Sequence, residues 1–165
     1  MNEGFSGRTL DYKWTLLGMK KVLAVSDSEH DSPQYFGPYS RVPRDRWQLR
    51  DSYVVEVTSI WDGHPYKKRI MFVDTNTFNI NAELTINRQN QVWKVFQATY
   101  KWEGAADGTA KDIEKSMPHP IMDGVIDIIN NTATLVHMGK GIEFPEMTKR
   151  SVRRVFSVSS LGEGK

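Results

Sequence analysis

The chain has 165 residues, of which 39% are hydrophobic and 25% are charged, and it contains no cysteine. These values exclude global disorder, disulfide bonds, thiolate metal sites and cysteine nucleophiles, and the length predicts a single domain over residues 1–165. The formal net charge is +2, with the basic excess near the C-terminus. A broad basic face for DNA or RNA is therefore absent, and nucleic acid is not an expected partner.

The N-terminal segments predict a strand followed by a long polar loop. Met1–Leu10 lacks the charged-then-apolar pattern of a signal peptide, which leaves a mature, truncated or cytoplasmic chain open. Residues 11–25 are typical of a strand pair or of one bulged strand, with the alternation broken at Gly18. Residues 26–43 are rich in polar residues, Pro and Gly, and predict an 18-residue loop. No run of apolar residues approaches the roughly 18 that a membrane-spanning helix needs.

The strongest pattern in the sequence is the period-two alternation from Arg46 to Trp61. Alternation over sixteen residues predicts one long strand, which must twist and curl because it exceeds the usual strand length. Its apolar parity consists of Trp47, Leu49, Tyr53, Val55, Val57 and Trp61.

Three further strands are predicted over residues 66–73, 78–86 and 92–102. Short polar turns separate them, and connections of about four residues leave no room for a crossover. We therefore expect the four strands from Arg46 to Trp102 to pair sequentially in an antiparallel meander.

The C-terminal third predicts less regular structure. Residues 103–122 are punctuated by Gly and Pro, short strands are expected over 125–129 and 132–138, and residues 144–156 fit one helix. The polar face of that helix would carry Lys149, Arg150, Arg153 and Arg154. These four residues are candidates for contact with anionic lipid or an acidic partner, and a solvated helix face is the alternative.

No catalytic, metal or cofactor site is predicted. The phosphate-binding, dinucleotide-binding, zinc-protease and serine-hydrolase motifs are absent, and the four histidines are scattered without ligand spacing. Asp74 and Glu83 could form the carboxylate pair of a hydrolase, but Asp74 opens a turn and Glu83 lies among the polar positions of its strand. We expect a protein that is not an enzyme.

One helix of about three turns cannot cover a meander with this many large apolar residues. Uncovered apolar patches of more than a few hundred Å² usually bind something. The first hypothesis is that the face binds a lipid, an acyl chain or another lipophilic molecule. The second is that it pairs with another chain or a second copy. The candidate ligand-binding residues are Trp47, Leu49, Tyr53, Val55, Val57, Phe72, Ile80, Leu84, Phe96 and Tyr100.

Several motifs resemble a bacterial envelope family of the outer-membrane lipoprotein-sorting superfamily, which has the Lol-type carrier fold. The strand around Leu49–Val57, the Tyr-x-Lys-Arg motif at Tyr66–Arg69 and the strand at Tyr12–Lys21 match that family's pattern. Phe72–Phe78 matches loosely, and Phe144–Arg154 resembles its closing arginine-rich helix without the usual threonine.

The resemblance implies a periplasmic or cell-envelope protein of a Gram-negative bacterium that handles lipophilic molecules. The family has no established catalytic residues to transfer to this chain. The resemblance also implies that the chain is equivalent to the C-terminal portion of a longer family architecture. The expected fold is mainly β (α+β): a strongly curved antiparallel meander sheet, or half-open barrel, with one C-terminal helix.

Overall fold

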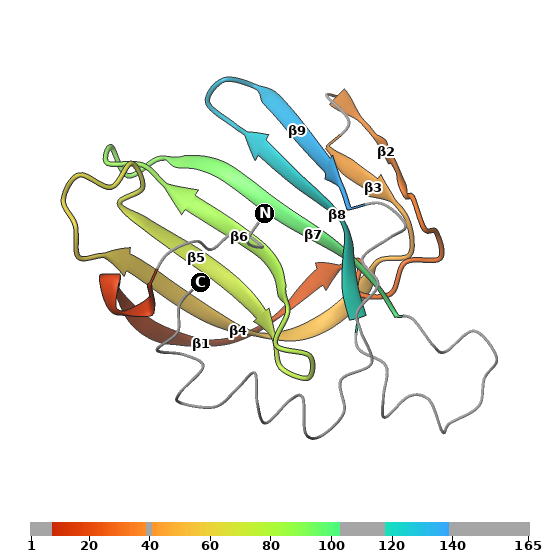
Figure 1. Cartoon of the computed structure of the whole chain (residues 1–165), viewed down its shortest axis with the longest axis horizontal. Coiled ribbons are helices and arrows are strands. Elements are labelled where there is room, and N and C mark those ends of the chain that lie inside the picture. The colour runs from red at the N-terminus through yellow and green to blue at the C-terminus, as the bar shows by residue number, and fades with distance from the viewer. Residues whose placement is uncertain (1–7, 39–40, 103–117, 139–165) are drawn as a thin grey trace, which may run out of the picture.

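The computed structural model describes residues 8–38, 41–102 and 118–138 (Figure 1). Nearly all of the regular structure in this part of the chain is β-strand, as the period-two patterns predict. The elements are η1 (Thr9–Asp11), β1 (Tyr12–Ala24), β2 (Gln34–Phe36), β3 (Val42–Arg44), β4 (Gln48–Ser59), β5 (Lys68–Asp74), β6 (Ile80–Ile86), β7 (Val92–Trp102), β8 (Pro118–Asp127) and β9 (Thr132–His137).

A curved seven-stranded antiparallel sheet forms the main layer, in the order β1-β4-β5-β6-β7-β8-β9 (Figure 1). The predicted sequential pairing of β4, β5, β6 and β7 is confirmed. β1 lies at one edge of the sheet and β9 at the other. The expected mainly-β meander is therefore correct.

β1 is one bulged strand rather than a strand pair. Its register against β4 shifts between Leu16 and Gly18, so that Leu17 is the extra residue. Gly18 has a φ of 134°, which a residue with a Cβ adopts only at a cost. The break in alternation at Gly18 thus predicted the bulge correctly.

The end of β1 returns to the middle of the molecule and meets β7. Val25 forms a parallel bridge with Thr99, and the Tyr100 N–H donates to the Val25 carbonyl at 2.9 Å. The Ser28 N–H donates to the Tyr100 carbonyl at 2.8 Å. These bonds fix the curl of the sheet, next to a buried cluster of Phe96, Ala98 and Tyr100.

The predicted loop over residues 26–43 contains a small second sheet, β2 paired with β3, which the sequence did not indicate. Its Tyr35 lies against the main sheet, where the Tyr35 hydroxyl is 3.2 Å from the Thr99 hydroxyl. A Cβ on Gly124 would stand 3.6 Å from the Tyr35 ring and 3.4 Å from Leu135, so the ring packs over this part of β8 at ordinary contact distance. Strands of three residues are too short to show a period.

β8 begins at Pro118, within the stretch predicted to be irregular. Prolines are tolerated there because Pro118 is the first residue of the strand and Pro120 lies beside a register shift. Pairing with β9 begins only at Met122. The predicted helix over residues 144–156 lies outside the described residues. No helix in the described ranges has the length and apolarity needed to cross a membrane.

Phe78 lies in the β5–β6 turn, although the sequence placed it in the strand, which begins at Ile80. It has a φ of 58° and is 70% exposed. A bulky residue in this left-handed conformation is strained, and its exposed ring adds no core packing.

We expect Phe78→Asn to raise the free energy of unfolding by about 0.5–1 kcal/mol, because Asn tolerates the left-handed region. Phe78→Val should lower it, since a β-branched side chain is less tolerant of that conformation. Urea denaturation of both variants tests this, and a stable Val variant beside an unstable Asn variant would contradict it.

Candidate apolar binding surface

The cross-strand register divides the main sheet into two faces. Side chains in register on neighbouring antiparallel strands lie on the same face, and successive residues alternate between faces. Face one carries the rows Leu16, Val55, Met71, Glu83, Phe96 and Trp14, Val57, Arg69, Thr85. Face two carries the rows Thr15, Glu56, Ile70, Leu84, Val95 and Gly18, Val54, Phe72, Ala82, Gln97.

Face one is exposed and apolar along β1 and the adjacent part of β4. Leu23 pairs with Leu49, Met19 with Tyr53 and Leu16 with Val55. Leu16, Met19, Leu23 and Leu49 are each 60–63% exposed, and Tyr53 and Val55 are half-buried. Single exposed apolar residues are ordinary, but several on one face, interrupted only by the Lys21–Asp51 ion pair, form a candidate interaction surface. We define the edge strip as Trp14, Leu16, Met19, Leu23, Leu49, Tyr53 and Val55.

The middle of face one is buried and contains an ion pair. Glu83 lies between Met71 and Phe96 in its row and is 1% exposed. Arg69 Nη1 is 3.7 Å from Glu83 Oε1, and the Arg69 guanidinium lies 5.0 Å from the centre of the Tyr66 ring. Burial raises the pKa of Glu83 to about 7, although Arg69 opposes the shift. The Glu83 carboxyl therefore titrates near neutral pH.

Aromatic rings extend along one end of the sheet. His64 lies 5.9 Å from Tyr12 and 5.4 Å from Tyr66, and Tyr66 lies 5.5 Å from Trp93, measured between ring centres. Burial lowers the pKa of His64; its backbone hydrogen bond with Tyr66 opposes this, and nearby guanidinium groups lower it further. The rings link the start of β1 to β7 and border the edge strip where Tyr12 adjoins Trp14.

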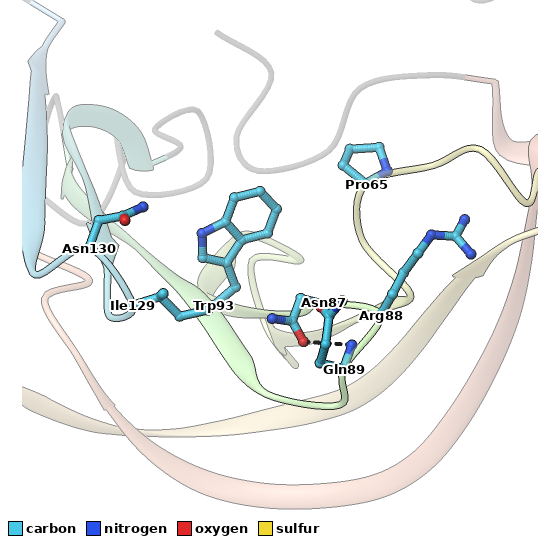
Figure 2. Close-up of a pocket in the computed structure, with 7 residues that line it drawn as sticks. All are labelled: Pro65, Asn87, Arg88, Gln89, Trp93, Ile129 and Asn130. Atoms are coloured by element: carbon cyan, nitrogen blue, oxygen red, sulfur yellow. Dashed lines mark hydrogen bonds between the residues drawn. The ribbon is translucent and has the colours of Figure 1, made fainter.

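An open pocket of about 420 Å³ lies beyond these rings, between the turns at the same end (Figure 2). The Trp93 indole forms part of its wall and donates from Nε1 to Asp127 at 3.0 Å. The Asn87 amide oxygen accepts the backbone N–H groups of Gln89 and Gln91, so it is already used within the turn. The pocket is lined by Pro65, Asn87, Arg88, Gln89, Trp93, Ile129 and Asn130. Its polar groups stabilise the turns and present no catalytic arrangement.

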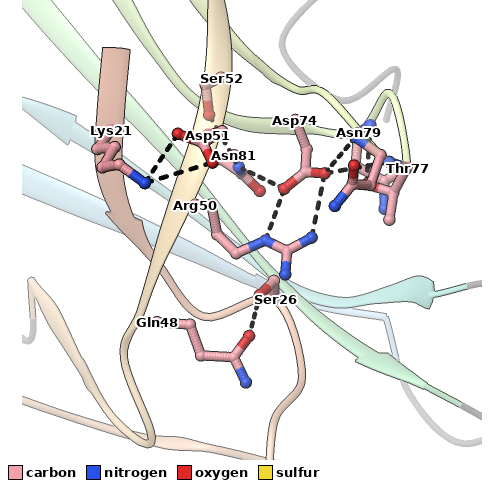
Figure 3. Close-up of polar contacts among 11 residues, drawn as sticks. Lys21, Ser26, Gln48, Arg50, Asp51, Ser52, Asp74, Thr77, Asn79 and Asn81 are labelled. Carbon is pink, nitrogen blue, oxygen red and sulfur yellow. Dashed lines mark hydrogen bonds and ion pairs between the residues drawn. The ribbon is translucent and has the colours of Figure 1, made fainter.

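A partly buried ion pair joins the other end of β4 to the last residue of β5 (Figure 3). Arg50 Nε donates to Asp74 Oδ2 at 2.8 Å, and Asp74 Oδ1 accepts the N–H groups of Asn76 and Thr77. Burial alone would raise the pKa of Asp74, but these hydrogen bonds and the Arg50 charge outweigh it and lower the pKa to about 2. Asp74 pairs with Ser52 on face two.

The sheet therefore separates Asp74 and Glu83, the two candidate carboxylates of a hydrolase pair. Asp74 lies on face two and Glu83 on face one, so they cannot act on a common substrate. Within the described residues, no three His, Asp or Glu side chains are grouped to hold a metal ion.

The predicted ligand-binding residues do not all share one face. Phe72 and Leu84 lie on face two, so their assignment to a common surface with Val55 and Val57 is wrong. Trp47 precedes β4 and donates from its indole Nε1 to the Pro43 carbonyl at 3.1 Å. The structure brings seven of the ten onto face one: Leu49, Tyr53, Val55, Val57, Ile80, Phe96 and Tyr100.

The error arose because the apolar positions of every strand were assigned to the same face of the sheet. Each strand alternates as predicted, but the register sets the apolar parity of β4 beside Arg69 in β5 and Glu83 in β6. The prediction also omitted Met19 and Leu23, although alternation around the Gly18 bulge carried that signal. Lys149, Arg150, Arg153 and Arg154 lie outside the described residues.

The described residues thus form a curved antiparallel sheet with an exposed, mainly apolar strip at one edge. The chain belongs to the family described as "Protein of unknown function (DUF1329)", whose sequence profile matches residues 2–161. No curated protein matches it in sequence.

Three solved structures are similar to it at low sequence identity. A putative outer membrane lipoprotein-sorting protein domain from Vibrio parahaemolyticus is 10% identical with a TM-score of 0.49, covering 84% of this chain and 47% of that one. A LolA superfamily protein from Nitrosomonas europaea is 14% identical with a TM-score of 0.48, covering 77% and 42%. A DUF1329 family protein from Desulfovibrio piger is 12% identical with a TM-score of 0.46, covering 92% and 47%. The chain spans less than half the length of each.

Asp74 should stabilise the fold above its ordinary pKa of 3.8, and this contribution should be lost as the pH falls toward 2, because the folded state holds the carboxylate charged. We expect Asp74→Asn to lower the free energy of unfolding by about 1–3 kcal/mol at pH 7. The difference between variant and wild type should shrink below pH 3. Urea denaturation at several pH values measures it, and a pH-independent difference would contradict the ion-pair account.

Glu83 should have the opposite dependence. Its pKa is raised from 4.5 to about 7, so the folded state binds an additional proton between those values and stability falls as pH rises through them. Between pH 4.5 and 8, the free energy of unfolding should fall by about 1–3 kcal/mol less in the Glu83→Gln variant than in the wild type, as urea denaturation would measure. If wild type and variant lose stability in parallel over that range, the buried carboxyl is not the cause.

Proposed function

We propose that this protein binds a lipid, an acyl chain or another lipophilic molecule on face one, as a carrier or sorting protein of the periplasm or cell envelope. In this proposal the edge strip forms the contact surface. Binding is non-covalent and requires no cofactor. The proposal rests on the exposed apolar side chains of β1 and β4 and on the sequence resemblance described above.

The observation that carries the proposal is the number of exposed apolar groups on one face of β1 and β4. Leu16 and Met19 follow one another on face one of β1, and the pair Leu23 and Leu49 lies on the same face beyond the Lys21–Asp51 ion pair. Removing apolar surface from water yields about 25 cal/mol per Å² before the costs of association. An acyl chain lying along the strip would therefore gain free energy without any specific polar contact.

Other residues of face one have a supporting role in this proposal. Val57, Phe96 and Tyr100 are at most 5% exposed, so they form the base on which the strip rests. Tyr53 and Val55 connect that base to the exposed rows. Lys149, Arg150, Arg153 and Arg154 are proposed to contact anionic lipid headgroups or an acidic partner.

The double variant Leu16→Ser/Met19→Ser should weaken binding of a fluorescent fatty acid by about tenfold or more, because each side chain contributes on the order of 1–2 kcal/mol when buried. Wild type should bind the probe saturably in a fluorescence titration.

The matched control is Ile128→Ser/Ile129→Ser, which removes two half-exposed apolar side chains in the β8–β9 turn, across the sheet from β1. It should bind like the wild type. Absence of saturable binding by wild type, with self-association in sedimentation, would instead favour the hypothesis that the apolar face pairs with a second copy.

A further inference from the structure

β1 presents an open backbone edge as well as an apolar face. In the described part of the chain it forms a ladder only with β4, and its other side has no strand partner. In an antiparallel pair, N–H and C=O groups that do not face the partner strand face the open edge. From Thr15 to Leu23 these groups point away from the sheet. Such an edge can be satisfied by an added strand.

β1 has only part of the usual protection of an edge strand. Lysines and a bulge normally blunt an edge strand, and β1 has both. However, Leu16, Met19 and Leu23 are 60–63% exposed on one face, and Leu17 at the bulge is 54% exposed. A strand with this much exposed apolar surface is an interaction site or an aggregation hazard.

The charges on β1 are all positive. Lys13 and Lys20 are in register with Thr58 and Ser52, which places them on face two, and neither forms an ion pair with a described residue. Lys21 is paired with Asp51 of β4 at 3.1 Å. A second copy of β1 would bring further lysines and no acidic residue to this edge. Carboxylates on an added strand would instead form cross-strand pairs with Lys13 and Lys20.

We propose that β1 is a docking strand for an extended segment of another polypeptide. The segment pairs with the open edge through its backbone, with apolar residues on face one beside Leu16, Met19 and Leu23. Its acidic residues lie on face two beside Lys13 and Lys20. This inference concerns the backbone edge and goes beyond the proposed lipophile site, although an added strand would widen face one.

Two synthetic ten-residue peptides test the chemistry, one alternating valine and glutamate and the other alternating valine and lysine. The glutamate peptide should bind saturably in fluorescence anisotropy, about tenfold more tightly than the lysine peptide, because two opposite-charge pairs replace two like-charge pairs. Hydrogen–deuterium exchange should slow at β1 amides when it binds, and not at β9.

Charge reversal separates strand docking from general electrostatic attraction. The Lys13→Glu/Lys20→Glu variant should bind the lysine peptide more tightly than the glutamate peptide. The control variant Lys67→Glu/Arg88→Glu carries the same charge change on two exposed residues outside β1. It should still bind the glutamate peptide more tightly than the lysine peptide. Both variants should bind the fatty-acid probe as the wild type does, so this proposal can fail without the lipophile site failing.

Equal binding of both peptides, or binding without protection of β1, would overturn the proposal. A concentration-dependent dimer with β1 amides already protected would overturn it in favour of a second copy. The proposal would also fail if both charge variants lost the preference for the glutamate peptide to the same extent. Net charge, and not β1, would then select the peptide.

Discussion

The register of the antiparallel ladder is the constraint on which the structure depends. Because side chains alternate along every strand, one residue of slip would move a whole strand's apolar set to the other face. The register of each ladder, including the bulges in β1, β6 and β7, sets which side chains share face one. It gathers leucines of β1 and β4 at one edge and places Arg69 and Glu83 in the middle.

This register gives the sheet apolar side chains on both faces. Ile70, Phe72 and Leu84 are half-buried on face two, whereas the buried middle of face one is partly charged. Charged groups are costly to bury unless they are paired, and Arg69 partly offsets the burial of Glu83. The exposed free surface of face one is consequently its apolar edge. That edge consists mainly of exposed leucine and methionine side chains, with the Lys21–Asp51 ion pair among them.

The sequence predicted the features that local chemistry determines. Alternation from Arg46 to Trp61 located β4, turn residues located the hairpins, and Gly18 located the bulge in β1. It did not predict which residues of β5 and β6 would lie on the same face as Val55, because that depends on the register between neighbouring strands. Pro118 and Pro120 concealed the start of β8, since a strand with one open edge tolerates proline there.

The central claim is that the edge strip on face one is the contact surface for a lipophilic ligand. Photo-crosslinking with a fatty acid that carries a photoactivatable group near its methyl end, mapped by mass spectrometry, tests it most directly. The account predicts crosslinks to Leu16, Met19, Leu49 and Tyr53, and their suppression by excess unlabelled fatty acid. Crosslinks confined to Phe72, Leu84 and their neighbours on face two would contradict it.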